Sequence, residues 1–270
     1  MFGGPVFEFA EAQARIRARV GAMPKEARWR YIADATALDN LIERMRDNGL
    51  GYWVQELPRT PDTAAIEDYL RQRLRMCIEG VARLLPHRWN AAQRWLRLGA
   101  VLVLVEQVLV EEKAELGAAS EKVLALLDRL PLAGRWDHLR QTPYQHYIGK
   151  PLPFEAWLEN FPRHLPPLTR HERYIVHRLQ NIVSRHHRQI QAACDRALEE
   201  EHTIDTTLQW RLRSELAENL RELLGGYPFH AGLIMIYGLL ELLQYERCRA
   251  LLIGRSRGWE RPGLFAGAPA

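Results

Sequence analysis

The chain has 270 residues, of which 47% are hydrophobic, so it is long enough to bury a substantial core in one large domain or two smaller ones. Its formal net charge of +4 is small for a surface that tracks nucleic-acid phosphates. Its three cysteines, Cys77, Cys194 and Cys248, are too few and too scattered for the disulfide framework of a secreted protein, which favours buried free thiols in a reducing compartment.

The N-terminal segment carries no targeting signal of the secretory type. Residues 1–20 lack a basic region followed by an apolar run, as a signal peptide would have. The two charge-free apolar runs, residues 98–105 and 231–240, are far shorter than the roughly 20 residues that cross a bilayer. We therefore expect a cytoplasmic protein with no transmembrane segment.

Helical signals dominate the whole chain. Ala, Leu, Arg, Glu and Gln are abundant, apolar residues recur at intervals of three and four, and no alternation of β-branched residues is sustained. In chain order, we predict helices over residues 7–21, 26–48, 63–84, 88–115, 119–129, 133–140, 154–160, 168–200, 204–224 and 229–253. The pattern predicts an all-α fold.

Capping and turn residues support several of these boundaries. Asp62 follows a proline and precedes a helical pattern, and Thr169 is placed to cap the helix that begins near residue 170. The segment 225–228, Gly-Gly-Tyr-Pro, is a short turn between two helices. Such a turn favours antiparallel packing of its two flanking helices.

One helical pattern occurs twice. In each copy an amphipathic helix leads to a leucine pair, a proline-containing turn and then a helix too apolar to be exposed, which must be covered on nearly all sides. This repetition predicts a pseudo-repeat helical bundle. Its expected parts are a first unit over residues 1–115, a second unit over 116–258 with a proline-rich insertion at 141–167, and a flexible tail over 259–270.

Catalytic and cofactor motifs are missing from the sequence. There is no Gly-x-Ser-x-Gly elbow and no glycine-rich phosphate loop. His171, His177, His186 and His187 share one predicted helix, but no two of them have the i, i+4 spacing of a helical metal site. We therefore expect no enzyme, no cofactor and no metal; a helical metalloenzyme that uses His171, His177 and His202 stays as an alternative.

Arginines gather in two places. Arg173 and Arg178 belong to a strongly cationic stretch at 170–188, while Arg247, Arg249 and Arg255 crowd the end of the last predicted helix. Cations at a helix C-terminus are stabilised by the helix dipole, so one interpretation is a solvated face with dipole compensation. The other interpretation is a contact surface for an acidic partner, in which the last helix leaves the core at its arginines.

The end of the last predicted helix also carries a family resemblance. Residues 247–255, Arg-Cys-Arg-Ala-Leu-Leu-Ile-Gly-Arg, resemble the Asn-Leu-Arg-x-Ile-x-x-Gly-Lys ending of the C/d family of central-stalk socket subunits in A-type and V-type rotary ATPases. Thr142-Pro143-Tyr144 resembles that family's Thr-x-Tyr turn, and Tyr227-Pro228 before an apolar helix resembles its proline-led step. The sequence departs from the family at Arg247, Cys248, Leu251 and Arg255, and it is shorter than the three-repeat members.

The resemblance implies a non-catalytic, funnel-like helical subunit on the cytoplasmic face of a membrane rotor ring, which receives the central stalk. The partners that it implies are rotor-ring and central-stalk subunits of an ion-translocating ATPase. Partner-contact residues are then expected at Arg173, Arg178, Arg247, Arg249, Arg255 and Tyr144. The alternative is a helical binding module for an acidic protein or nucleic acid, which would use the basic helix at 170–188.

Overall fold

The structure is a computed structural model that describes residues 10–58, 61–83, 85–92, 96, 158, 161–199, 206–227 and 232–258. These residues contain helices and no strand, which confirms the predicted all-α class. The chain forms two compact units, one made of Met1–Pro86 with Thr169–Ala270 and the other of His87–Leu168. This division differs from the predicted boundary near residue 115, because the N-terminal helices pack against the last helix of the chain.

The N-terminal part of the first unit is a series of short helices followed by a long one. Its elements are α2 (Ala10–Ala22), α3 (Glu26–Ala33), α4 (Leu38–Met45), the π-helical turn η1 (Arg46–Leu50), α5 (Gly51–Val54) and α6 (Thr63–Ala82). The single helix predicted over 26–48 is therefore wrong. The N–H of Asp34 closes α3 on the carbonyl of Arg30, and Ala37 takes an extended backbone before α4. The break lets Ile32 of α3 and Leu41 of α4 both be buried.

A glycine turn connects η1 to α5. Gly49 has φ = 87°, a conformation that side-chain-bearing residues rarely adopt. A Cβ atom at this position would lie 2.5 Å from the carbonyl oxygen of Ala22, at the end of α2. The turn therefore needs glycine for its backbone angle and for the close approach of α2.

Three long helices complete the first unit: α12 (Arg170–Glu199), α13 (Thr206–Gly226) and α14 (Leu233–Ser256). They confirm the predicted helices 168–200, 204–224 and 229–253 to within a few residues. The predicted caps are present: Thr169 and Glu172 form a reciprocal capping box, and Asp62 accepts a hydrogen bond of 2.7 Å from the N–H of Ala65.

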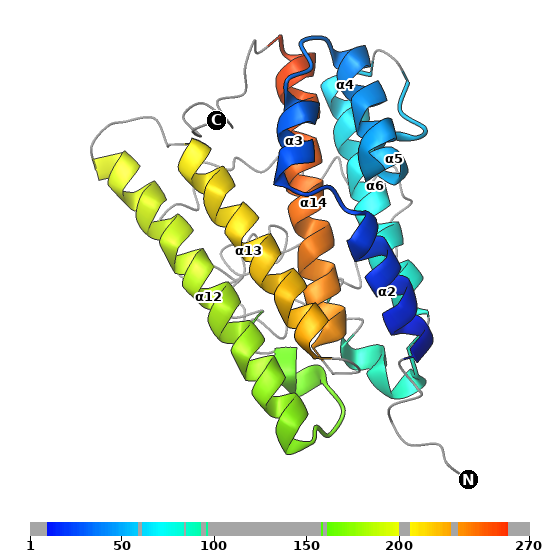
Figure 1. The fold of residues 1–270 in the computed structure, drawn as a ribbon, viewed down its shortest axis with the longest axis vertical. Coiled ribbons are helices and arrows are strands. Elements are labelled where there is room, and N and C mark those ends of the chain that lie inside the picture. The colour runs from blue at the N-terminus through cyan, green and yellow to red at the C-terminus, as the bar shows by residue number, and fades with distance from the viewer. Residues whose placement is uncertain are drawn as a thin grey trace, which may run out of the picture. The chain divides into compact units, whose positions relative to one another are not determined.

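Helix α14 is the centre of this unit. It packs along α6 and α13 and also contacts α4 and α2 (Figure 1). Its buried side chains cover nearly its full circumference, as expected for the apolar helix of the second repeat copy. The corresponding helix of the first copy, predicted over 88–115, lies mostly outside the described residues. Helix α12 packs along α13 and leaves its other face exposed.

The second unit is described at few positions. It contains the short helices η2 (His87–Trp89) and η4 (Phe161–His164), and Trp89, Leu96 and Leu158 are buried. The predicted helices 119–129, 133–140 and 154–160, most of the insertion at 141–167, and the tail at 259–270 lie outside the described residues. In the part of the chain that is described, no helix is long and apolar enough to cross a membrane.

Candidate functional site

The arginines at the end of α14 form the first candidate site, and Arg247 lies at its centre. Its side chain is 3% exposed, and its guanidinium lies 3.3 Å from Oε2 of Glu26 on α3. The guanidinium stacks over the ring of Trp210 at 4.5 Å and near that of Trp29 at 5.4 Å. Burial lowers the pKa of Arg247 to about 10, and the carboxylate of Glu26 opposes that shift. Arg247 therefore joins α14 to α3 and α13 from inside the unit.

Glu26 is held in place by two further donors from α13. The indole Nε1 of Trp210 donates to Glu26 Oε1 at 3.1 Å, and the hydroxyl of Ser214 donates to Oε2 at 2.8 Å. Arg247 also donates to Ser214 Oγ. Trp29 and Trp210 meet edge to face, with ring centroids 6.0 Å apart. One carboxylate of α3 is thus bonded to both α13 and α14.

Arg249 and Arg255 make separate attachments. Nε of Arg249 donates to Oε1 of Glu67 on α6 at 3.0 Å, and Arg71 pairs with the other oxygen of the same carboxylate. Arg255 is buried and donates to the carbonyl oxygen of Ala33, at the end of α3, at 3.0 Å. Together with the bonds of Arg247, these bonds lie along the last three turns of α14 and hold the helix against α3 and α6.

The expectation that α14 leaves the core at these arginines is wrong. Arg247 and Arg255 are buried within the unit, and Arg249 is half-buried against Glu67. The reason is that carboxylates and carbonyls from the N-terminal helices lie opposite the arginines and compensate their burial. Of the partner-contact residues predicted on α14, two are therefore inside the unit and one is engaged in an internal ion pair.

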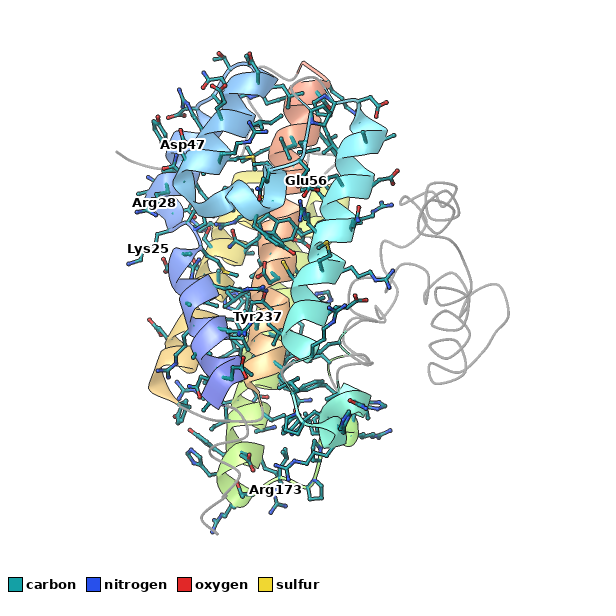
Figure 2. All side chains as sticks on the ribbon, turned by 90° about the vertical axis from the view of Figure 1, so that its right-hand side faces the viewer. Lys25, Arg28, Asp47, Glu56, Arg173 and Tyr237 are labelled. Carbon is teal, nitrogen blue, oxygen red and sulfur yellow. The ribbon has the colours of Figure 1, made fainter. Side chains whose placement is uncertain are left out.

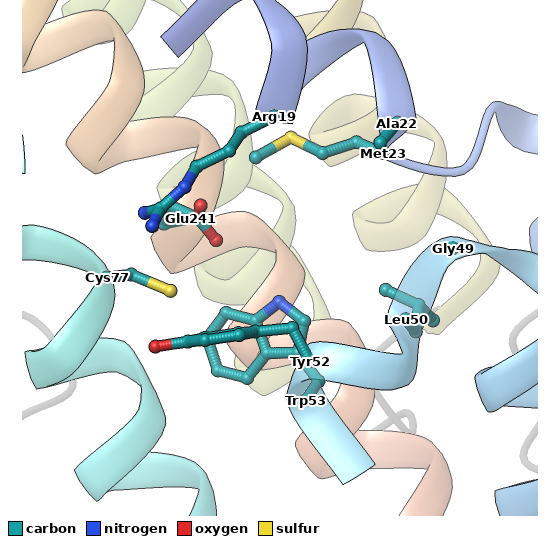
Figure 3. Close-up of a pocket in the computed structure, with 9 residues that line it drawn as sticks. All are labelled: Arg19, Ala22, Met23, Gly49, Leu50, Tyr52, Trp53, Cys77 and Glu241. Carbon is teal, nitrogen blue, oxygen red and sulfur yellow. The ribbon is translucent and has the colours of Figure 1, made fainter. Parts of the chain in front are cut away.

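A second polar group lies further back along α14, beside a cavity. Glu241 is 4% exposed, and one turn before it Tyr237 is 1% exposed. Nη1 of Arg19, on α2, donates to the Tyr237 hydroxyl at 2.7 Å. Burial raises the pKa of the Glu241 carboxyl, although its hydrogen bonds and the nearby guanidinium act in the opposite direction. Figure 2 shows Tyr237 between the helices of the unit, and Figure 3 shows the side chains that surround the cavity.

The cavity has a volume of about 210 Å³ and is lined largely by apolar and aromatic surface. Its lining residues are Arg19, Ala22, Met23, Gly49, Leu50, Tyr52, Trp53, Cys77 and Glu241. Burial raises the pKa of the Cys77 thiol, as it does for the buried thiol of Cys248. A thiol in this state is a poor nucleophile. The described part of the cavity therefore offers hydrogen-bonding groups but no activated nucleophile.

The exposed face of α12 is the third candidate. Ile175, Leu179 and Val183 are buried on one side of the helix, while Arg173, Arg178 and the other arginines of this stretch are exposed on the opposite side. Arg178 also donates to the Tyr227 hydroxyl at the end of α13 at 2.9 Å, so its position is fixed. The structure thus places two predicted contact residues, Arg173 and Arg178, together on one open surface. Tyr144 lies outside the described residues.

The histidines of α12 do not converge. His171 and His177 are exposed, whereas His186 is buried and its ring lies 3.1 Å from the amide of Asn219. Burial lowers the pKa of His186, which favours its neutral form. Among the residues that the structure describes, no group of three or more potential ligands could hold a metal ion. His202 lies outside them.

Sequence reasoning missed the partners of these arginines. Glu26 and Glu67 lie in ordinary amphipathic segments, and no local pattern distinguishes them from solvated glutamates. Glu241 did carry a signal, because it ends the apolar run at 231–240 and continues inside a helix too apolar to be exposed. Comparison of the chain with family models, with curated proteins and with solved structures finds no match.

Proposed function

We propose that the protein is a non-catalytic central rotor subunit, which couples the central stalk to the membrane rotor ring of an A/V-type ion-translocating ATPase. The proposal starts from the resemblance of residues 247–255 and of the helical repeat to the C/d family of socket subunits. It implies a peripheral position on the cytoplasmic face of the membrane, with rotor-ring and central-stalk subunits as partners. It also implies that the chain carries no catalytic residues.

The attachment of α14 to its neighbouring helices is the structural observation that supports this proposal most directly. The helix is surrounded by four others, and its last turns are joined to α3 and α6 by Arg247, Arg249 and Arg255. A subunit that transmits torque must resist deformation, and closely packed helices with charge-assisted cross-links supply that resistance. In this proposal the arginines of the resembling segment stiffen the subunit rather than contact its partners.

Affinity purification of the tagged full-length chain from mildly solubilised membranes of its native host tests the proposal. We expect rotor-ring and central-stalk subunits to co-purify with it. A stable monomer that carries neither would refute the proposal.

A matched pair of variants tests whether the ion pair between Arg249 of α14 and Glu67 of α6 stiffens the subunit. Arg249→Gln removes the ion pair between α14 and α6, whereas Arg15→Gln removes an exposed pair with Glu11 on α2. We expect both variants to assemble, and only Arg249→Gln to lower the ratio of ions pumped to ATP hydrolysed. Equal coupling in the two variants would contradict a stiffening role for Arg249.

The exposed arginines of α12 favour a second candidate, a helical module that binds an acidic protein or nucleic acid. Salt-dependent retention on heparin or RNA would support it, provided that Arg173→Ala combined with Arg178→Ala abolishes the retention. Retention that survives both substitutions would contradict a role for Arg173 and Arg178 in this binding.

A further inference from the structure

The exposed side of α12 carries a row of five arginines and one tyrosine that we call the α12 crest. It consists of Arg170, Arg173, Tyr174, Arg178, Arg185 and Arg188, all of which are exposed. The only acidic residue between positions 170 and 189 is Glu172, which is half-buried and bonded to Thr169. Residues 170–189 therefore expose no carboxylate that could pair with the crest arginines in place of an external anion.

The crest holds the net charge of the chain. Residues 170–189 contain five arginines and one glutamate, and the whole chain has a formal net charge of +4. The remaining sequence is consequently neutral in total. Charge that is this concentrated is unusual for a solvated helix face, where both signs normally alternate.

The crest runs along the length of α12 on one side of the helix. From Arg170 to Arg188 a helix rises about 27 Å, and the exposed positions of the crest occupy an arc of roughly 140°. The buried residues Ile175 and Leu179 lie on the other side, where α12 packs along α13. A flat anionic surface laid against α12 would therefore meet the other four arginines at once, while Arg178 is bonded to Tyr227 at the end of α13.

The neighbouring helix disfavours a partner that wraps around α12. Helix α13 exposes Glu215, Glu218 and Glu222 beside a single exposed arginine, Arg211, which lies 3.9 Å from Glu215, and the charge of Glu215 acts on His186 of α12. The walls of a nucleic-acid groove would flank α12 and bring phosphates toward this side of α13, which exposes more carboxylates than arginines. A plane that touches only the crest is separated from α13 by α12 itself; the axes of packed helices lie about 8–10 Å apart, which is close to the Debye length.

The composition of the crest disfavours a protein partner. Tyr174 is its one aromatic residue, and none of the exposed side chains between positions 170 and 189 is aliphatic. Protein interfaces concentrate aromatic and apolar side chains at their centre, whereas lipid headgroups are held by arginines that pair with phosphate.

We propose that the α12 crest binds the anionic headgroups of a lipid bilayer, with α12 lying along the membrane surface. The contact is electrostatic and inserts no apolar side chain, so added salt weakens it. It is additional to the rotor-ring and central-stalk contacts proposed above and does not depend on them, but it replaces the second candidate function, which assigns the same arginines to an acidic protein or nucleic acid.

Two triple variants with the same net charge test this proposal. The crest variant carries Arg173→Gln, Arg185→Gln and Arg188→Gln. The control variant carries Lys25→Gln, Arg28→Gln and Arg30→Gln, three exposed cations at the start of α3 and within it. Figure 2 shows Lys25 and Arg28 at the left of the view, well above Arg173, which lies near the bottom. Either variant lowers the formal charge of the chain from +4 by three.

Co-sedimentation with vesicles of phosphatidylcholine, with and without phosphatidylglycerol, measures the binding. We expect wild type to bind only vesicles that contain phosphatidylglycerol. The crest variant should lose roughly fivefold per arginine, on the order of a hundredfold for three. The control variant should bind like wild type. Circular dichroism checks that both variants keep their helices, and Arg→Lys substitutions at the three crest positions should preserve binding because they preserve charge.

Several outcomes would overturn the proposal. Equal losses in the two triple variants would show that net charge, and not the crest, governs binding. Binding to pure phosphatidylcholine would show that the contact is not electrostatic. Binding to single-stranded RNA or to polyglutamate, with no binding to anionic vesicles at the same ionic strength, would assign the crest to a different partner.

Discussion

The ion pair between Glu26 and Arg247 contributes to the free energy of unfolding, and substitutions at these two positions measure how strongly it holds α14 to α3. Replacing Glu26 by Gln keeps the shape of the side chain but removes the charge that compensates the buried guanidinium. Removal of one partner of a buried pair typically costs about 3–5 kcal/mol. Because the Glu26 side chain is 27% exposed and water replaces part of the lost interaction, we expect about 2–3 kcal/mol.

Replacing Arg247 by Met tests the other half of the pair. The variant removes a cation whose burial is unfavourable and puts a flexible thioether between the indoles of Trp29 and Trp210, where sulfur–aromatic contacts are favourable. We therefore expect a loss below about 1.5 kcal/mol, or a gain in stability. In the Met background, Glu26→Gln should cost less than about 1 kcal/mol, since no guanidinium is left uncompensated.

Urea unfolding of the wild type, the two single variants and the double variant gives these free energies. The cycle should show a coupling between the two positions of about 2 kcal/mol. The reasoning would be refuted if Glu26→Gln had the same cost in both backgrounds, because its effect would then not come from the charge of Arg247. A loss for Arg247→Met larger than that for Glu26→Gln would refute it as well.

Three further stability measurements follow from the same unit. Burial raises the pKa of Glu241 above its ordinary value of 4.5, so the folded state retains a proton that the unfolded state releases, and stability falls as pH rises from 4.5 toward the folded-state pKa. Unfolding of Glu241→Gln across this range should lack that part of the fall; an identical pH profile would contradict the assignment. Gly49→Ala should cost more than about 2 kcal/mol, while Gly225→Ala, which meets nothing within 4 Å, should be neutral or stabilising by about 0.5 kcal/mol in thermal unfolding. Equal effects would show that the Gly49 turn relaxes. Gln244 is 1% exposed, and its side-chain amide has no hydrogen-bond partner among the described residues. Gln244→Met should therefore raise the free energy of unfolding by about 1 kcal/mol, and a loss would indicate a partner for the amide.

The helices of the first unit could be predicted because their signals are local. The buried run of α14 and the amphipathic pattern of α12 recur every three to four residues, and the cap at Thr169 lies within one turn of the residues that it serves. The same local signals could not predict the break between α3 and α4. Residues 34–37 contain neither glycine nor proline, and the break follows from the burial of both short helices in one core.

The candidate site residues also divide into those whose exposure could be predicted from local sequence and those whose burial could not. The exposure of Arg173 and Arg178 could be expected from the period of α12, because one face of that helix is apolar and the other is basic. The burial of Arg247 could not, since an arginine is almost never fully buried unless it is paired, and the partner of Arg247 is distant in the sequence.

By itself the sequence determined an all-α protein, the extent of its long helices, a central helix that must be covered, and the placement of basic residues on one face of α12. Only the tertiary structure decided which arginines are internal. Arg247 meets a carboxylate 221 positions earlier in the chain, and Arg249 meets one 182 positions earlier. Helical periodicity reports which face of a helix is buried, but a buried charge is compensated by whichever distant residue the fold places opposite it.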